Sequence, residues 1–260
     1  MIWMAGFTVI PLLMVFYYGL TDRSGAFTLA NILAIGSSEH LKALWLSLVL
    51  AGVSTVICLV LAYPLALILR KRHIGKGSFV VFIFILPMWM NFLLRTMAWQ
   101  TLLEKNGVIN TFLTMLHLPN IAIINTPAAI ILGMVYNFLP FMVLPIYNVL
   151  VKIDKDVISA ARDLGAGNIQ TFTKIILPLS VPGIISGITM VFVPALTTFV
   201  ISNLLGGSKI LLIGNVIEQE FQQGSNWHVG SGLSLVLMIF IIASMALIAK
   251  YDKDGEGTAF

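Results

Sequence analysis

Residues 152–183, KIDKDVISAARDLGAGNIQTFTKIILPLSVPG, form the longest polar segment of an otherwise apolar chain. Apolar side chains in its first half recur with the period of one helix face, and they are Val157, Ala160, Ala161 and Leu164. Gly165 follows, at a place where helices commonly end in a left-handed conformation. A second amphipathic turn is expected to follow, with Asn168 as its N-cap. Pro178 and Pro182 are expected to end the segment. The pattern predicts a helix–glycine–helix elbow that serves as a docking surface.

The composition indicates a membrane protein. The 260 residues are 58% hydrophobic and only 10% charged, with a mean hydropathy of +0.98, whereas a soluble domain carries about a quarter charged residues. The apolar runs are long and do not alternate with polar residues, which favours membrane-spanning helices over strands. The single cysteine, Cys58, lies inside such a run, so a disulfide framework is excluded. We therefore predict an all-α, polytopic membrane protein.

Six apolar runs are close to the roughly 20 residues that a bilayer-spanning helix needs. The predicted spans are 2–20, 43–69, 77–101, 127–150, 182–204 and 230–249. The first run has no basic flank and no cleavage site, so we expect it to be a span rather than a signal peptide. The spans predict three regions, namely a first helix with its outer loop (1–42), a core of five helices that includes the elbow (43–250), and a tail (251–260).

The distribution of lysine and arginine orients the spans, because cytoplasmic loops carry the excess of these residues. One predicted side holds Arg70, Lys71, Arg72, Lys76, Lys152, Lys155, Arg162, Lys174, Lys250 and Lys253. The other side holds only Arg23, Lys42, Lys105 and Lys209. This asymmetry predicts a protein of the cell (inner) membrane with the elbow and both termini in the cytoplasm.

Other features of the spans bear on packing and movement. The outer loop 205–229 has an apolar centre that predicts a helix, either tucked against the bundle or lying on the membrane. Gly183 and Gly187 have the GxxxG spacing, which predicts close packing with a helix of this chain or of a second subunit. Prolines inside spans suit a pathway that opens and closes, and they also occur in static bundles; they are Pro87, Pro140, Pro145 and Pro194.

Catalytic and metal-binding patterns are absent from the sequence. The histidines are scattered without an i, i+4 partner, which argues against a metal site; they are His40, His73, His117 and His228. No phosphate-loop or nucleophile-elbow motif occurs, so neither a nucleotide site nor an enzyme activity is predicted. The spans contain no Asp or Glu, which argues against a carrier driven by protons or sodium ions. We therefore expect energy to enter through a partner at the elbow.

Arg95 is the only charged residue within a predicted span. Its separation from Gly77 corresponds to about 27 Å along a straight helix, which places it near the outer interface. There a long side chain can snorkel into the headgroup region at reduced cost. We expect snorkelling, with a role in a transport pathway as the alternative.

The elbow resembles the E-A-A-x3-G-x9-I-x-L-P signature of the permease subunits of ABC importers of the type I (MetI-like) fold. The corresponding residues are Ser159, Ala160, Ala161, Gly165, Ile175, Leu177 and Pro178. Ser159 stands in place of the Glu of the signature, which puts in doubt a salt bridge that family members make there. The stretches 139–145, 204–207 and 211–217 resemble the spermidine/putrescine permeases of the PotB type. Asn203 is a second departure, because some of those permeases carry Asp at this point.

The resemblance implies a subunit that pairs with a homologous second permease, receives two ATPase subunits through the elbow and takes substrate from an external binding protein. ATP and Mg²⁺ would bind to the ATPases, so no cofactor is expected in this chain, and nucleic acid is not an expected partner. Candidate pathway residues, each with helix packing as the alternative role, are Asn91, Trp99, Tyr136, Asn137 and Asn203. Glu218 and Glu220 are candidates to attract a polyamine or contact the binding protein, or else form a solvated face.

Several functions stay open on the sequence. The first hypothesis is an ABC importer permease for polyamines, and the second is a related permease for sulfate, iron or another organic cation. A carrier driven by ion gradients and a membrane scaffold that recruits a cytoplasmic partner are the remaining alternatives.

Overall fold

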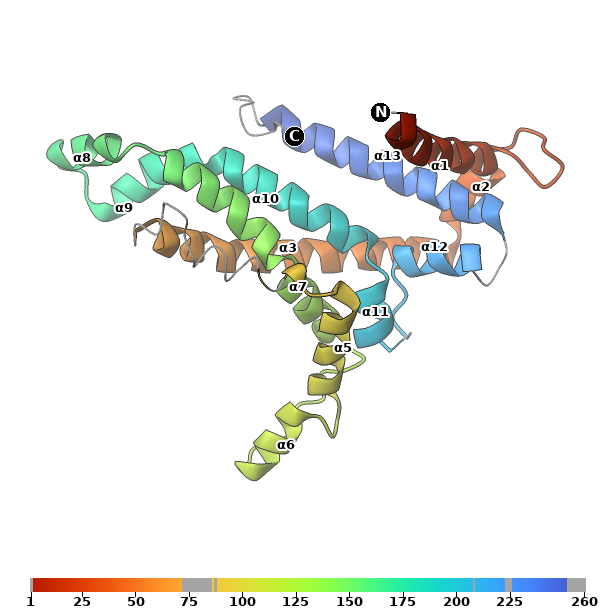
Figure 1. The fold of residues 1–260 in the computed structure, drawn as a ribbon, viewed down its shortest axis with the longest axis horizontal. Helices are drawn as coiled ribbons and strands as arrows, with labels where there is room; N and C mark the ends of the chain where they lie inside the picture. Colours follow the sequence, from red (N-terminus) through yellow and green to blue (C-terminus); the bar gives the residue numbers. More distant parts are fainter. Residues whose placement is uncertain (1, 72–85, 87, 208, 223–225, 252–260) are drawn as a thin grey trace.

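The computed structural model describes residues 2–71, 86, 88–207, 209–222 and 226–251 (Figure 1). Within these residues the regular structure is helical, apart from one isolated β-bridge between Thr21 and Phe27, so the predicted all-α class is confirmed. The long helices are α1 (Ile2–Leu20), α3 (Ser38–Lys71), α7 (Pro127–Lys152), α10 (Leu177–Thr197) and α13 (Trp227–Tyr251). The shorter elements are α2 (Ala30–Leu33), the 3-10 turn η1 (Ala34–Gly36), α5 (Phe92–Leu103), α6 (Val108–Met115), α8 (Lys155–Asp163), α9 (Asn168–Thr171), the π-turn η2 (Phe172–Ile176), α11 (Val200–Leu205) and α12 (Ile213–Gln222).

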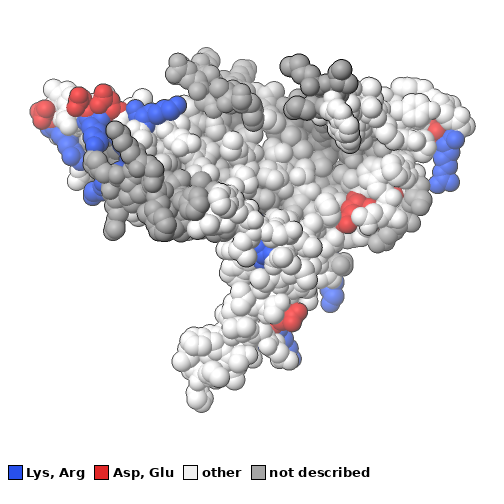
Figure 2. All heavy atoms as spheres, viewed as in Figure 1, with Lys and Arg blue, Asp and Glu red and all other residues white. Residues whose placement is uncertain are grey.

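The long helices have the length and composition of membrane spans. Among the described residues, four helical segments are long and apolar enough to cross a membrane, namely Ser38–Lys71, Pro127–Lys152, Asn168–Thr197 and Trp227–Ala246. α1 adds a further apolar helix. Charged side chains gather at one end of the molecule, over α8 and α9, while most of the visible surface of the long helices is uncharged (Figure 2).

α7 is the centre of the bundle and packs against α3 and α10. Small side chains along one face of α3 let the two backbones approach closely; these buried residues are Ala51, Ser54, Thr55, Cys58, Ala62 and Ala66. From α7, the fully buried side chains of Ile130, Met134 and Ile146 belong to the same core. The three helices therefore form the frame on which the remaining elements are placed.

The two glycines spaced as GxxxG lie against α7. A Cβ atom at Gly183 would stand 2.9 Å from the Pro145 carbonyl oxygen and 3.1 Å from the Cα of Ile146, and one at Gly187 would stand 2.6 Å from the Sδ of Met142. Their missing side chains thus allow α10 and α7 to approach each other. The predicted close packing is confirmed, and the packed helix belongs to this chain.

The predicted spans 127–150 and 230–249 are confirmed with small shifts at their ends, and the run 2–20 is confirmed as an apolar helix. The predicted span 43–69 lies within the longer α3. Other predicted features fall outside the described residues, namely Arg72, His73, Lys76, the span residues 77–85, Pro87 and the tail from 252.

The predicted span 182–204 is wrong at both ends. The helix that crosses this region passes through Pro178 and Pro182 and ends at Thr197. The π-turn η2 directly precedes Pro178, and its wider hydrogen-bond spacing accommodates a residue that lacks an N–H group and whose ring crowds the preceding turn. The break comes instead at Thr198, whose backbone is extended (φ −66°, ψ 138°).

The predicted span 77–101 is not one straight helix in its described part. The helix ends near Met90, and the Oδ1 atom of Asn91 caps a new helix, α5, by accepting the backbone N–H groups of Leu93 and Leu94 at 2.8 and 3.3 Å. α5 and α6 then project from the other helices as an arm (Figure 1).

α1 and α13 pair in antiparallel directions, with Gly19 near the end of α1 against the backbone of Ser231 near the start of α13. The side chains of Asn31 and His228 close this end of α1, where their nitrogens lie 2.8 and 2.6 Å from the carbonyl oxygen of Thr21. Since a carbonyl only accepts, the Nδ1 atom of His228 carries the proton. α10 runs from the elbow toward α12, and α13 runs back from α12. The C-terminal end of α13 and the N-terminal end of α1 therefore lie on the elbow side.

Candidate coupling and pathway sites

The first half of the elbow has the predicted helix–glycine form. α8 begins after Asp154, whose side chain accepts a backbone N–H group of the first turn. It ends in a Schellman motif, in which Ala166 donates to the Ala161 carbonyl at 3.0 Å and Gly165 donates to the Arg162 carbonyl at 2.9 Å. Gly165 has φ +85°, a conformation that costs glycine little. The predicted glycine turn is confirmed.

The second elbow helix begins one residue earlier than predicted. Gly167, not Asn168, is the N-cap, and its N–H group donates to the side-chain oxygen of Gln170 at 3.2 Å. From α9 the chain continues through η2 into α10 as one helical segment. The elbow and the spanning helix are therefore a single element.

The elbow presents apolar side chains that this chain does not cover. Leu164 is 89% exposed and Ile169 is 79% exposed, on either side of the glycine turn. Of the seven signature residues, Ala161 is buried, Ile175 and Leu177 are half-buried, and Ser159, Ala160, Gly165 and Pro178 are exposed. An apolar surface rimmed by charged side chains is typical of a protein–protein contact site.

Side chains of α3 hold both ends of the elbow. Arg70 donates to the carbonyl oxygen of Ile153, where α7 passes into the elbow, at 3.1 Å. The hydroxyl of Tyr63 is hydrogen-bonded to the Oγ atom of Ser180 at 2.8 Å, and its ring meets Phe172 of η2 edge to face at 5.8 Å. These contacts fix the position of the elbow relative to the bundle.

Asn215 organises the opposite end of the bundle, where α11 and α12 meet. This residue is 1% exposed. Its Oδ1 atom accepts from the Ser202 hydroxyl at 2.6 Å and the Leu212 N–H group at 2.9 Å. Its Nδ2 atom donates to the Phe199 carbonyl at 3.1 Å and to the Oδ1 atom of Asn203 at 2.8 Å. Both ends of the amide are used, so its orientation is fixed.

The helix predicted within 205–229 is confirmed as α12, and its first turn is buried. The N–H group of Ile213 donates to the Oγ atom of Ser47 on α3 at 2.8 Å. Gly214 lies so close to the end of α10 that a Cβ atom there would stand 2.7 Å from the Thr197 carbonyl oxygen. α12 is thus part of the bundle rather than a helix that lies on the membrane.

Two candidates that are 15 residues apart in sequence meet here. Asn203 donates through Nδ2 to the Oε2 atom of Glu218 at 3.0 Å, and Gln222 donates to Oε1 at 3.3 Å. Glu220 does not join them, because it lines a separate hollow of about 340 Å³ together with Lys209 and residues of α3. The two outer-loop carboxylates therefore face different surroundings.

The expectation that Arg95 snorkels is wrong. Its side chain is 7% exposed, and its Cζ atom lies 5.8 Å from the ring centroid of Tyr136 on α7. The bend at Asn91 explains the difference, because the distance estimate assumed a straight helix. The rings of Trp99 and Tyr136 meet edge to face at 5.1 Å. Two pathway candidates are thus in contact with each other beside a buried cation.

The other two pathway candidates, Asn91 and Asn137, bond to backbone groups of nearby helix turns. Asn91 caps α5, as described above. Asn137 is 1% exposed and donates through Nδ2 to the Gly133 carbonyl at 2.8 Å, while its Oδ1 atom has no hydrogen-bond partner in the described part of the chain. Trp99 and Tyr136 are the candidates seen in contact with each other, and the place of all five in a pathway stays a prediction.

Sequence reasoning missed Asn215 and His228. The available signal for Asn215 was an amide inside the apolar run LLIGNVI, since a buried amide must find partners. His228 was considered only as a metal ligand, yet it closes the end of α1. The described residues contain no group of three His, Cys, Asp or Glu side chains placed to hold a metal ion.

Solved structures of ABC transporters share this fold. One is a bacterial transporter involved in the import of the acidic polysaccharide alginate, whose matching chain gives a TM-score of 0.75 at 17% identity and covers 98% of this chain and 92% of that chain. Another is a bacterial alginate transporter in complex with an alginate pentasaccharide-bound periplasmic protein, with a TM-score of 0.76 at 17% identity and coverage of 100% and 93%. At this level of identity the likeness shows that the fold is shared.

Residues 59–251 match the family described as binding-protein-dependent transport system inner membrane component, and the chain belongs to this family of ABC importer permeases. The spermidine/putrescine transport system permease protein PotB of Haemophilus influenzae is 39% identical over 260 residues, which cover 96% of this chain and 91% of the relative. PotB of Escherichia coli is 39% identical over 254 residues, with coverage of 95% and 92%. The inner membrane ABC transporter permease protein YdcU of Escherichia coli is 30% identical over 237 residues, with coverage of 86% and 75%. The predicted permease fold and family resemblance are confirmed.

Proposed function

We propose that this chain is the permease subunit of an ATP-driven importer for polyamines such as spermidine and putrescine. The observation that carries the proposal is its 39% identity to PotB along 96% of the chain. The fold alone does not determine the solute, because alginate transporters share it at 17% identity. Uptake of sulfate, iron or another organic cation is the competing outcome.

We propose that the elbow is the place where this subunit meets its ATPases. Its uncovered side chains, Leu164 and Ile169 above all, supply the apolar area that a groove of a partner would bury. Two ATPase subunits would bind ATP and Mg²⁺, one on this elbow and one on the elbow of a second permease. This chain would then have no catalytic role and no cofactor of its own. An external binding protein would deliver the substrate.

In this arrangement, closure of the ATPases moves the elbows and turns the spans as rigid bodies. The asymmetry of basic residues supports a cytoplasmic elbow. The antiparallel pairing of α1 with α13 supports a cytoplasmic position for the N-terminal end of α1 and the C-terminal end of α13, because both lie on the elbow side.

Uptake by the assembled importer tests the substrate. The complex of both permeases, two ATPases and the binding protein is placed in vesicles, and labelled spermidine is supplied outside with ATP inside. We expect ATP-dependent uptake that unlabelled putrescine reduces and that sulfate leaves unchanged. Absence of spermidine uptake by an active ATP-hydrolysing complex would reject the polyamine assignment and favour another solute.

A further inference from the structure

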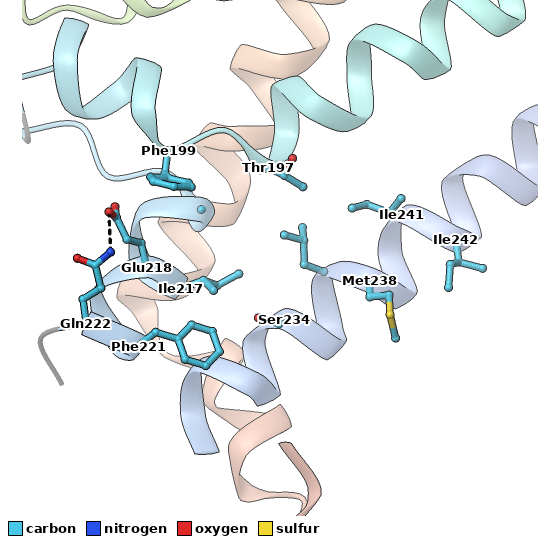
Figure 3. Close-up of a pocket in the computed structure, with 12 residues that line it drawn as sticks. Thr197, Phe199, Ile217, Glu218, Phe221, Gln222, Ser234, Met238, Ile241 and Ile242 are labelled. Carbon is cyan, nitrogen blue, oxygen red and sulfur yellow. Dashed lines mark hydrogen bonds between the residues drawn. The ribbon is translucent and has the colours of Figure 1, made fainter. Parts of the chain in front are cut away.

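We propose that a cavity between α10, α12 and α13 binds an alkylammonium group, with the carboxylate of Glu218 as its charged ligand. The cavity has a volume of about 520 Å³, within the range of small-molecule sites. The inference rests on the proposed function in one respect only, because polyamines are the alkylammonium ions that this importer is expected to carry. Figure 3 shows the side chains that line the cavity.

Among the described residues that line the cavity, Glu218 is the only one with a formal charge. Its two hydrogen bonds, from Asn203 and Gln222, come from neutral amides. They hold the carboxylate in place without cancelling its charge. A carboxylate has about four acceptor positions, so two remain for the donors of an ammonium group. A negative charge at the edge of the cavity favours a cation over an anion.

Most of the remaining lining of the cavity is apolar. Glu218 and Gln222 lie at one end, and Met238, Ile241 and Ile242 of α13 lie toward the other (Figure 3). This arrangement matches a molecule with a charged end and a methylene chain, because the chain gains from burial against apolar side chains. A bare metal ion or a fully polar solute would gain nothing from that half of the cavity.

Aromatic rings also line the cavity. Phe199 and Phe221 line the same cavity as Glu218 (Figure 3). The face of an aromatic ring attracts a cation, which adds to the attraction of the carboxylate. A cavity lined by a carboxylate and two aromatic rings suits an organic ammonium ion.

The site also bears on Asn203, which stands where some permeases of the PotB type carry Asp. Position 203 carries an amide, and the structure supplies the negative charge from Glu218 on the neighbouring helix, in hydrogen-bond contact with that amide. The charge is thus present at this end of the bundle, although it comes from a different position in the sequence.

A cysteine reporter tests occupancy directly. Ser234 lines the cavity, and the single native cysteine, Cys58, is buried, so a Ser234→Cys variant gives this chain one reactive thiol. Membrane vesicles with the assembled importer are treated with N-ethylmaleimide and increasing spermidine. We expect spermidine to slow the labelling, and n-butylamine, protonated at pH 7, to slow it where n-butanol does not.

The second test removes the negative charge of Glu218. In Ser234→Cys with Glu218→Gln, which keeps the size and hydrogen bonds of the side chain, we expect the half-protecting concentration of spermidine to rise about tenfold. The matched control is Ser234→Cys with Glu104→Gln, which removes an acidic residue on the arm and leaves protection unchanged. The proposal is overturned by equal protection in the Glu218→Gln and control variants, or by protection from n-butanol equal to that from n-butylamine.

The two proposals fail in different ways. Spermidine uptake by the wild-type importer without protection at Ser234→Cys would leave the transport function standing and reject this site. Protection by n-butylamine without any spermidine uptake would keep the alkylammonium site and reject the polyamine importer. If Glu218→Gln reduces the amount of assembled complex, the comparison of n-butylamine with n-butanol on Ser234→Cys alone decides.

Discussion

Arg70 near the end of α3 donates a hydrogen bond to the carbonyl oxygen of Ile153, 83 residues further along the chain, at 3.1 Å. The bond joins the core helix α3 to the point where α7 becomes the elbow. A second link runs from Tyr63 to Ser180, in the first turn of α10. The elbow is thus held by α3 on both sides, which suits an element that transmits force.

Removal of the Arg70 link is expected to uncouple transport from ATP hydrolysis. A hydrogen bond with a charged donor contributes about 1.5–3 kcal/mol, so Arg70→Met loosens the elbow without unfolding the bundle. We expect spermidine uptake per ATP hydrolysed to fall several-fold in reconstituted vesicles. Arg23→Met, at the opposite end of the molecule, is the control and keeps the wild-type ratio. An unchanged ratio in Arg70→Met would show that the bond has no part in coupling.

The turn at Gly165 is expected to depend on backbone conformation alone. A Cβ atom there would meet nothing within 4 Å, yet φ is +85°, which costs other L-residues about 1–2 kcal/mol and β-branched residues most. Gly165→Val should therefore reduce ATP-dependent uptake while the protein still inserts, and Gly165→Asn should retain most of it. Normal uptake by Gly165→Val would contradict the assignment of the elbow as the coupling element.

Alanine substitutions at Gly183 and Gly187, where α10 packs against α7, are expected to destabilise the protein to different extents. At Gly183 a new Cβ atom meets the backbone of Pro145 and Ile146, which cannot move aside, whereas at Gly187 it first meets the flexible side chain of Met142. We expect Gly183→Ala to destabilise the protein by about 1–3 kcal/mol and Gly187→Ala by less. The unfolding midpoint of the purified protein in detergent measures both, and the reverse order would contradict this account of the packing.

Two buried asparagines are expected to differ in how much stability they lose on replacement by leucine. Asn215 makes four hydrogen bonds, so Asn215→Leu leaves several buried groups without partners, at about 1–3 kcal/mol each. Asn137 has an unpaired Oδ1 atom in the described part of the chain, so Asn137→Leu should change the stability by less than about 1 kcal/mol. Thermal unfolding of both variants checks this contrast. A large loss in Asn137→Leu would mean that its amide has a partner outside the described contacts.

The sequence was sufficient for the features that depend on local chemistry. Long apolar runs predicted the helices, because burying a backbone in lipid requires helical hydrogen bonding. The spacing around Gly165 predicted the turn, because few residues adopt its conformation. GxxxG predicted a close helix contact, although which helix lay against it required the structure.

Other features depend on which parts of the chain meet, and the sequence predicted these poorly. Pro178 and Pro182 ordinarily end a helix, yet a π-turn beside them lets the helix continue. Arg95 was placed by assuming a straight helix, and the cap at Asn91 bends that path. The pairing of Asn203 with Glu218 joins two helices across a turn, a contact that no spacing rule describes.

The continuity of the segment Asn168–Thr197 has a mechanical consequence. Its 30 residues run from the elbow to the opposite end of the bundle, where Thr197 lines the same cavity as Glu218. From η2 onward α10 measures about 30 Å, so a pivot of about 10° at the π-turn swings its tip by about 5 Å. Such a lever needs no relay of side chains through the membrane. A movement of the elbow would then change the shape of the cavity at the other end of α10 directly.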